Sequence, residues 1–256
     1  MNIPSRSMSP LARALSLALA TLPLAPASVA RAETGPLAGR WAFLQVTTSA
    51  AEIPVIGKVY ATTSAVSIHK LKHKGNRLRG KGRICRIDLD SGSPLVKTAM
   101  PEALLASLPA PRIDAQVQED GGAWRFSQAR QTIVLGAKLD APTTDALPRL
   151  LGDPRIIDQD GDGAPAVTIR VSGIVSGELR VVQRSWTELS GRGASSERIE
   201  GSLAFGTEQV ILDATSSMLK TAPPQAPEPS RSYFRLVKLS KGASCSDALA
   251  ATRERR

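Results

Sequence analysis

Alternating polar and apolar positions are most regular in residues 64–90 and predict a β-hairpin there. Basic residues recur at every second position in residues 70–74 and again in residues 77–83, on either side of Gly75 and Asn76. Two runs of period two around a Gly-Asn pair are typical of two strands joined by a two-residue turn. This register places on one face Lys70, Lys72, Lys74, Arg77, Arg79, Lys81 and Arg83. The opposite face is mildly apolar and is expected to lie on a core; it carries His69, Leu71, His73, Leu78, Gly80 and Ile84.

The same kind of alternation predicts about ten strands along the chain. Besides the hairpin, the predicted strands cover residues 37–47, 113–118, 123–128, 131–139, 166–175, 178–189, 197–205, 208–214 and 232–239. Pro101 suits the first turn of a short helix over residues 101–108, and a second short helix is predicted over residues 144–151. A turn is expected at Gly206-Thr207. The pattern favours a mainly β fold, an antiparallel barrel or sandwich with two short helices.

The N-terminal residues have the pattern of a secretory signal peptide. Arg6 and Arg13 precede an apolar run at residues 14–24, and Ala30-Arg31-Ala32 resembles a cleavage site. The apolar run is too short to span a bilayer, and no transmembrane segment is expected in the mature chain. We therefore expect an exported protein, periplasmic or secreted. Its predicted parts are a signal peptide (1–32), a single β-barrel or sandwich domain (33–240) and a C-terminal tail (241–256).

Cys85 and Cys245 are the two cysteines of the chain. In exported proteins an even number of cysteines more often forms disulfides than free thiols. We therefore predict a disulfide between them, which would attach the C-terminal segment to the basic hairpin.

The positive charge is concentrated in the hairpin. The formal charge of +10 falls to +7 without residues 1–32, and residues 70–86 carry eight Lys or Arg and no acid, so the rest of the mature chain sums to −1. Directly opposed like charges destabilise a sheet, and an anionic partner relieves that cost. We expect this face to bind an acidic glycan, a lipid headgroup or an acidic protein surface. A solvated face, or an edge strand protected by lysines, explains the same pattern.

Nucleic acid is not an expected partner. Export removes the protein from the cytoplasm, and single-strand binding uses aromatic side chains as stacking platforms. No Phe, Trp or Tyr lies between Tyr60 and Trp124. The same absence of aromatic residues argues against insertion into a membrane, so contact with lipid would be electrostatic.

Three carboxylates alternate in the segment Asp158-Gln159-Asp160-Gly161-Asp162-Gly163. Asp158, Asp160 and Asp162 with the following glycine match the first half of a calcium loop. The twelfth position is Ile169, so the acidic residue that completes an EF-hand is absent. We expect a structural Ca²⁺ held with carbonyls, waters or a more distant acid such as Asp153. The alternative is an Asp/Gly-rich turn without metal.

Few residues point to catalysis. His69 and His73 are the only histidines, and on a strand they lie about 13 Å apart, too far to share one metal ion. No G-x-S-x-G motif is present. We therefore expect no catalytic activity, although a pair of catalytic carboxylates leaves no sequence signature.

The first predicted strand opens with Gly39-Arg40-Trp41. Here the chain resembles the lipocalin-like barrels, whose first strand begins with G-x-W. That resemblance implies an up-and-down barrel and a small apolar ligand in its interior. Three functions are thus expected, in this order: an anion-binding surface protein, a lipocalin-like carrier and a carboxylate-based envelope hydrolase. A filled interior favours the first, an enclosed apolar cavity the second, and two acids about 5 to 9 Å apart across a cleft the third.

Overall fold

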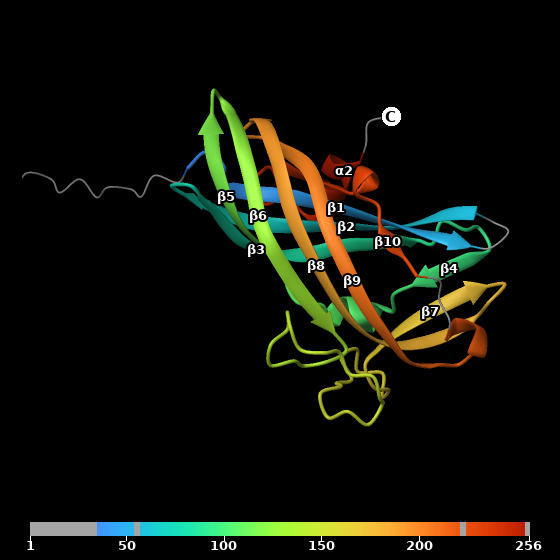
Figure 1. The fold of residues 1–256 in the computed structure, drawn as a ribbon. Helices are drawn as coiled ribbons and strands as arrows, with labels where there is room; N and C mark the ends of the chain where they lie inside the picture. The colour runs from blue at the N-terminus through green and yellow to red at the C-terminus, as the bar shows by residue number, and fades with distance from the viewer. Residues whose placement is uncertain (1–34, 54–56, 221–223, 254–256) are drawn as a thin grey trace, which may run out of the picture. The chain divides into compact units, whose positions relative to one another are not determined.

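The computed structural model describes residues 35–53, 57–220 and 224–253, and the predicted signal peptide lies outside these ranges. The described strands form one antiparallel sheet that closes on itself (Figure 1). Two α-helices accompany the sheet. The predicted fold class, a mainly β barrel or sandwich with two short helices, is therefore confirmed.

Eight strands make the ring, and they follow one another around it in chain order (Figure 1). They are β1 (Gly39–Ile53), β2 (Gly57–Lys74), β3 (Arg77–Asp90), β5 (Arg112–Asp120), β6 (Ala123–Leu135), β8 (Gly177–Ser195), β9 (Arg198–Ala214) and β11 (Tyr233–Leu239). The last strand, β11, pairs with both β9 and β1 and so closes the ring. This is the topology of an up-and-down barrel.

Three shorter strands extend the ring at one end. Strand β4 (Val96–Ala99) pairs with β7 (Val167–Gly173), and β7 pairs with the first residues of β8. The later residues of β8 pair with β6 instead, so β7 takes the place of β6 along the same edge. Strand β10 (Ala226–Pro227) pairs with β1. Residues 136–166, between β6 and β7, run outside this pairing and lie against the sheet.

Side chains fill the interior of the ring. Trp41 is fully buried, and its indole Nε1 donates a hydrogen bond to the Leu37 carbonyl at 2.9 Å. Phe234 packs against Phe43 and Phe126, with ring centroids 6.2 and 5.3 Å apart. Burying an apolar side chain of this size stabilises the fold by roughly 1.5 to 3 kcal/mol. The same cluster includes Leu71, Leu78, Ile113, Val117, Leu189, Ile199, Leu203 and Leu236.

Helix α1 (Glu102–Ser107) fills the other end of the interior and confirms the helix predicted over residues 101–108. Its Leu104 is fully buried against Val167 and Val181. The helix predicted over residues 144–151 is wrong, because this segment forms turns. The Asp145 carboxylate there accepts a hydrogen bond from the Ala141 amide, an alternative to helical pairing.

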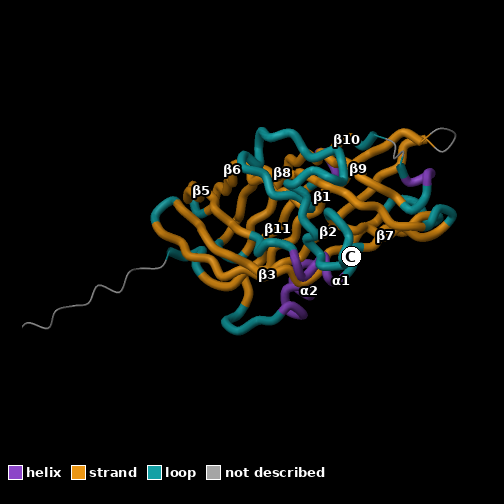
Figure 2. The backbone as a smooth tube through the Cα atoms, turned by 90° about the horizontal axis from the view of Figure 1, so that it is seen from below, coloured by secondary structure: helices purple, strands orange, loops and turns teal. Residues whose placement is uncertain are grey.

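The second helix, α2 (Cys245–Thr252), lies after Lys241, in the segment expected to be a tail. Ser244 and Asp247 cap its N-terminus reciprocally. Ala248 packs with Ala42, Leu44, Val66 and Ile68. Helix α2 therefore lies on the outer face of β1 and β2 (Figures 1 and 2). The C-terminal segment is therefore a covering helix of the barrel.

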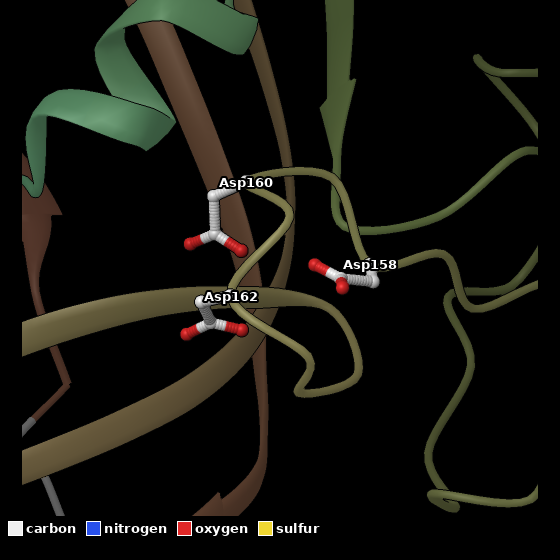
Figure 3. A group of neighbouring side chains, drawn as sticks. All are labelled: Asp158, Asp160 and Asp162. Carbon is white, nitrogen blue, oxygen red and sulfur yellow. The ribbon is translucent and has the colours of Figure 1, made fainter.

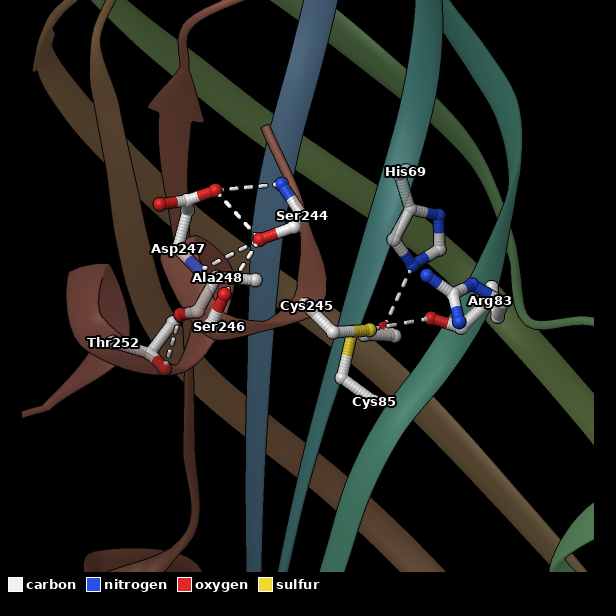
Figure 4. Close-up of a disulfide and its surroundings, with 10 residues drawn as sticks. His69, Arg83, Cys85, Ser244, Cys245, Ser246, Asp247, Ala248 and Thr252 are labelled. Carbon is white, nitrogen blue, oxygen red and sulfur yellow. Dashed lines mark hydrogen bonds between the residues drawn. A yellow bond between two sulfur atoms is a disulfide. The ribbon is translucent and has the colours of Figure 1, made fainter. Parts of the chain in front are cut away.

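The disulfide between Cys85 and Cys245 is present and joins β3 to the first residue of α2 (Figure 4). The Cα atoms of the two residues are 5.3 Å apart, within the range that a disulfide requires. The predicted bond is thus confirmed.

One predicted turn is wrong. Strand β9 continues through Gly206-Thr207 and pairs with β8 on both sides of that site. Gly206 lies opposite Trp186, and a Cβ at Gly206 would come within 2.5 Å of the indole Nε1. The glycine therefore accommodates a tryptophan across the strands and does not mark a turn.

Candidate functional site

The hairpin has the predicted register. Lys74 lies opposite Arg77, Lys72 opposite Arg79, and Lys70 opposite Lys81, with Gly75 in the left-handed conformation (φ +57°) at the turn. Leu71 and Leu78 between them are buried in the interior, so the basic side chains project outward. We call this outer surface the basic face; it comprises Lys70, Lys72, Lys74, Arg77, Arg79, Lys81 and Arg83.

Strands β1 and β5, which flank the hairpin, add two cations that sequence reasoning did not single out. Arg40 on β1 lies opposite Lys70, and Arg112 on β5 lies opposite Lys81. Together these four residues form one continuous line across four strands, the cation row. Adjacent strands are about 4.8 Å apart, so the row spans about 14 Å. Alternation alone could have signalled Arg40, because it precedes the inward-facing Trp41.

Two residues of the basic face have a carboxylate partner. Asp114 on β5 accepts hydrogen bonds from Arg77 Nη2 at 2.7 Å and from Arg79 Nε at 2.9 Å. The hydrogen bond from Arg79, helped by the charge of Arg77, lowers the pKa of the Asp114 carboxyl. This part of the face is therefore partly neutralised.

The cation row has no such compensation. Within the part of the chain that the structure describes, no carboxylate pairs with any of its four residues, nor with Lys72, Lys74 or Arg83. The Nε of Arg40 is also buried without a hydrogen-bond partner there. Like charges directly opposite one another destabilise a sheet, so repulsion within the cation row lowers the stability of the barrel.

An open depression of about 800 Å³ adjoins the basic face. Two residues lie where the depression meets that face. They are Asn76 in the hairpin turn and Gln116 on β5, which pairs with Arg77 on β3. The depression continues over β6 and β8, where its polar lining comprises Gln118, Arg125, Ser127, Ser190 and Arg192. Amides, hydroxyls and two guanidinium groups thus extend the charged surface sideways.

Both histidines are buried behind the basic face. His73 Nδ1 accepts a hydrogen bond from the Leu37 amide at 3.3 Å, and its Nε2 lies 2.9 Å from the Gly75 carbonyl. His69 Nε2 lies 2.8 Å from the Ser67 hydroxyl, and burial lowers the pKa of His69 to about 4. These contacts give both rings a packing role in the hairpin.

The acidic loop lies just before β7. The carboxylates of Asp158, Asp160 and Asp162 lie close together (Figure 3), and one oxygen from each lies within 4.8 Å of the others. A hydrogen bond from the Thr168 hydroxyl at 2.6 Å is the main reason that the pKa of Asp162 is lowered. Asp153, predicted as a further ligand, is not in this group: its carboxylate pairs with Arg155, which lowers its pKa to about 2.

In comparisons with known proteins, the chain matches no family model, no curated protein and no solved structure. Among the described residues, no helix is both long and apolar enough to cross a membrane. Function must therefore be argued from the geometry of the two charged sites.

Proposed function

We propose that the chain is an exported binding protein without catalytic activity, and that its basic face docks an anionic partner. The observation that carries this proposal is the cation row. Four directly neighbouring cations without a carboxylate partner in the described structure are a cost in the free protein. An anion laid across the row would offset that cost.

Among anionic partners, the geometry favours a linear acidic polysaccharide. The large apolar side chains that are exposed in the described residues, such as Leu150, Ile174 and Met218, lie away from the basic face, so nothing there would insert into a bilayer. The adjoining depression offers amide and hydroxyl groups that can hydrogen-bond sugar hydroxyls. A polymer carrying repeated carboxylates or sulfates would contact the row and the depression together.

Two further features support the proposal over its alternatives. The interior is occupied by Trp41, Phe126 and Phe234, which leaves a lipocalin-like carrier with less support. The three clustered acids belong to one loop and do not line the depression beside the basic face, which leaves a carboxylate-based hydrolase with less support. Export rests on the signal-like N-terminus and agrees with the disulfide.

Binding of the full chain to heparin and to polygalacturonate, each at low and high salt, tests the proposal. We expect saturable binding that weakens with salt. Replacing the centre of the row, Lys70→Ser with Lys81→Ser, is expected to weaken binding roughly tenfold at low salt, as for the loss of two exposed charge contacts. The matched control replaces two exposed cations of the 136–166 segment, Lys138→Ser with Arg149→Ser, and is expected to leave binding unchanged.

Parallel measurements decide the class of partner. Vesicles of phosphatidylglycerol and a DNA duplex are titrated under the same conditions. Binding to vesicles or DNA but to neither polysaccharide would contradict the polysaccharide assignment. Equal loss of binding in the row variant and its control would contradict the site itself.

A further inference from the structure

The loop that carries Asp158, Asp160 and Asp162 gathers negative charge, and it uses none of the residues of the basic face. Its carboxylates converge because the backbone holds them there. Gly161 and Gly163, both in the left-handed conformation, donate their amides to the two oxygens of Asp158 at 2.8 and 3.0 Å. A residue with a Cβ would be strained at either position.

Strand β7 fixes the other two carboxylates. The Thr168 amide donates to Asp160 Oδ2 at 2.9 Å, and the Thr168 hydroxyl donates to Asp162 Oδ2. These donors position the acids and leave lone pairs free on every carboxylate oxygen. Three acids so close together repel one another unless a cation lies between them.

Asp160 supplies an independent indication of such a cation. Its side chain is only 7 % exposed, and its Oδ1 is buried without a hydrogen-bond partner in the described structure. Figure 3 shows this carboxyl group directed toward the space between Asp158 and Asp162. A buried carboxylate oxygen without a partner is costly, and a metal ion satisfies it.

We propose that Asp158, Asp160 and Asp162 bind a Ca²⁺ ion that fastens the end of the 136–166 segment to β7. The ligands are all hard oxygens, which suits Ca²⁺ or Mg²⁺. Ca²⁺ fits better because it accepts irregular coordination, whereas Mg²⁺ requires near-octahedral geometry. The outer carboxylates, Asp158 and Asp162, are exposed, so waters can reach the ion to complete its shell.

The ion would sit at the junction of the segment and the sheet. Ala166, directly before β7, is fully buried with Ala137, Leu139, Leu147 and Val182, the residues that pack the segment against β8. Loss of the ion is therefore expected to loosen this packing and to leave the aromatic interior intact.

Calorimetric titration of the EDTA-treated full chain with CaCl₂ tests the site. We expect saturable heat, a higher melting temperature in CaCl₂ than in EDTA, and a much weaker response to MgCl₂. The variant Asp160→Asn is expected to bind Ca²⁺ roughly tenfold more weakly or worse, because it removes a charged ligand. Without metal it should melt no lower than the wild type, since its amide can donate to the neighbouring carboxylates.

The control variant is Asp140→Asn, which alters an exposed acid of the same segment and should bind Ca²⁺ as the wild type does. A wild-type chain that gives no heat and no melting shift with CaCl₂ would overturn the proposal. So would equal affinity in Asp160→Asn, and an equal response to MgCl₂ would overturn the choice of ion. Polysaccharide binding is measured separately, and its failure would leave this result unaffected.

Discussion

The basic face and the acidic loop both gather like charges, but they do so in different ways. On the basic face the register of a regular sheet repeats a cation at every second position and on neighbouring strands. In the loop, irregular backbone and specific amide donors bring three acids together. The sheet leaves its cations toward solvent, whereas the loop surrounds its acids with donors and leaves one buried oxygen without a partner. We infer that the first site suits an extended partner and the second a single ion.

Removing the disulfide is expected to have the largest effect on stability, and it tests whether the basic face and the acidic loop are independent. Replacing Cys85 and Cys245 by Ser opens a link that spans 160 residues. In the chain-entropy model this costs about 4 to 5 kcal/mol of unfolding free energy. Denaturant titration of the double variant measures the loss. Because the bond lies beside the basic face and far along the chain from the loop, the shift in melting temperature caused by CaCl₂ should persist; its disappearance would show that the two regions are coupled.

Acidification tests the buried side of the hairpin. The pKa of His69 is about 4 in the folded protein, against 6.5 as the ordinary value. As the pH falls below 6.5, His69 becomes protonated in the unfolded chain, whereas in the folded chain it stays neutral until about pH 4. The free energy of unfolding therefore falls over this window by roughly 3 kcal/mol.

Chemical denaturation of the wild type and of His69→Gln between pH 7 and pH 4 measures this contribution. The difference between the two proteins should shrink as the pH falls, because only the wild type carries the penalty. A constant difference would mean that His69 is protonated equally in both states.

Removing one donor from the acidic loop is expected to have a smaller effect. Thr168→Val deletes the hydroxyl that hydrogen-bonds Asp162 and keeps the shape of the side chain. The expected loss is about 1 kcal/mol of unfolding free energy, together with a rise in the pKa of Asp162, which NMR titration can follow. Thr98→Val on β4 is a comparison for the same chemical change away from the loop, and an equal loss there would argue against a specific role for Thr168.

The smallest expected effect has the opposite sign. Lys81→Gln removes a cation that faces Lys70 on one side and Arg112 on the other. We expect the unfolding free energy to rise by up to about 0.5 kcal/mol at low salt, and this gain to vanish at high salt. Lys138→Gln, in the 136–166 segment, is the control. A loss of stability in Lys81→Gln at low salt would show that the row is not under repulsion.

Local pattern predicted the hairpin well, because alternation and a Gly-Asn turn are enough to define its register. It did not give the register of β1 on β2 or of β5 on β3, which places Arg40 opposite Lys70 and Arg112 opposite Lys81. Gly206 has the local pattern of a turn, because nothing in the neighbouring sequence indicates that Trp186 lies opposite it. Helix α2 is absent from the predicted elements although the sequence carries its signal: Ser244 and Asp247 form a capping box before an alanine-rich stretch.

For the acidic loop, spacing predicted that three carboxylates would converge. The burial of Asp160 and its unpartnered oxygen depend on how the loop folds against β7, where the Thr168 amide holds only the other oxygen of the carboxylate. No spacing rule contains that information. Asp153 lies outside this group, and its carboxylate pairs with Arg155, two residues away. Sequence thus indicated which atoms were available, and the fold determined which of them remained free.

Pairing of the first ring strand with the last has a consequence for how the protein matures. Arg40 and Leu239 are partners across β1 and β11, so the edge of β1 over Arg40–Val46 remains unpaired until residues 233–239 are present. Contacts this distant along the chain are slow to form. A chain emerging from a ribosome or a membrane channel would therefore carry this open strand edge until residues 233–239 were out, and the ring could close only then.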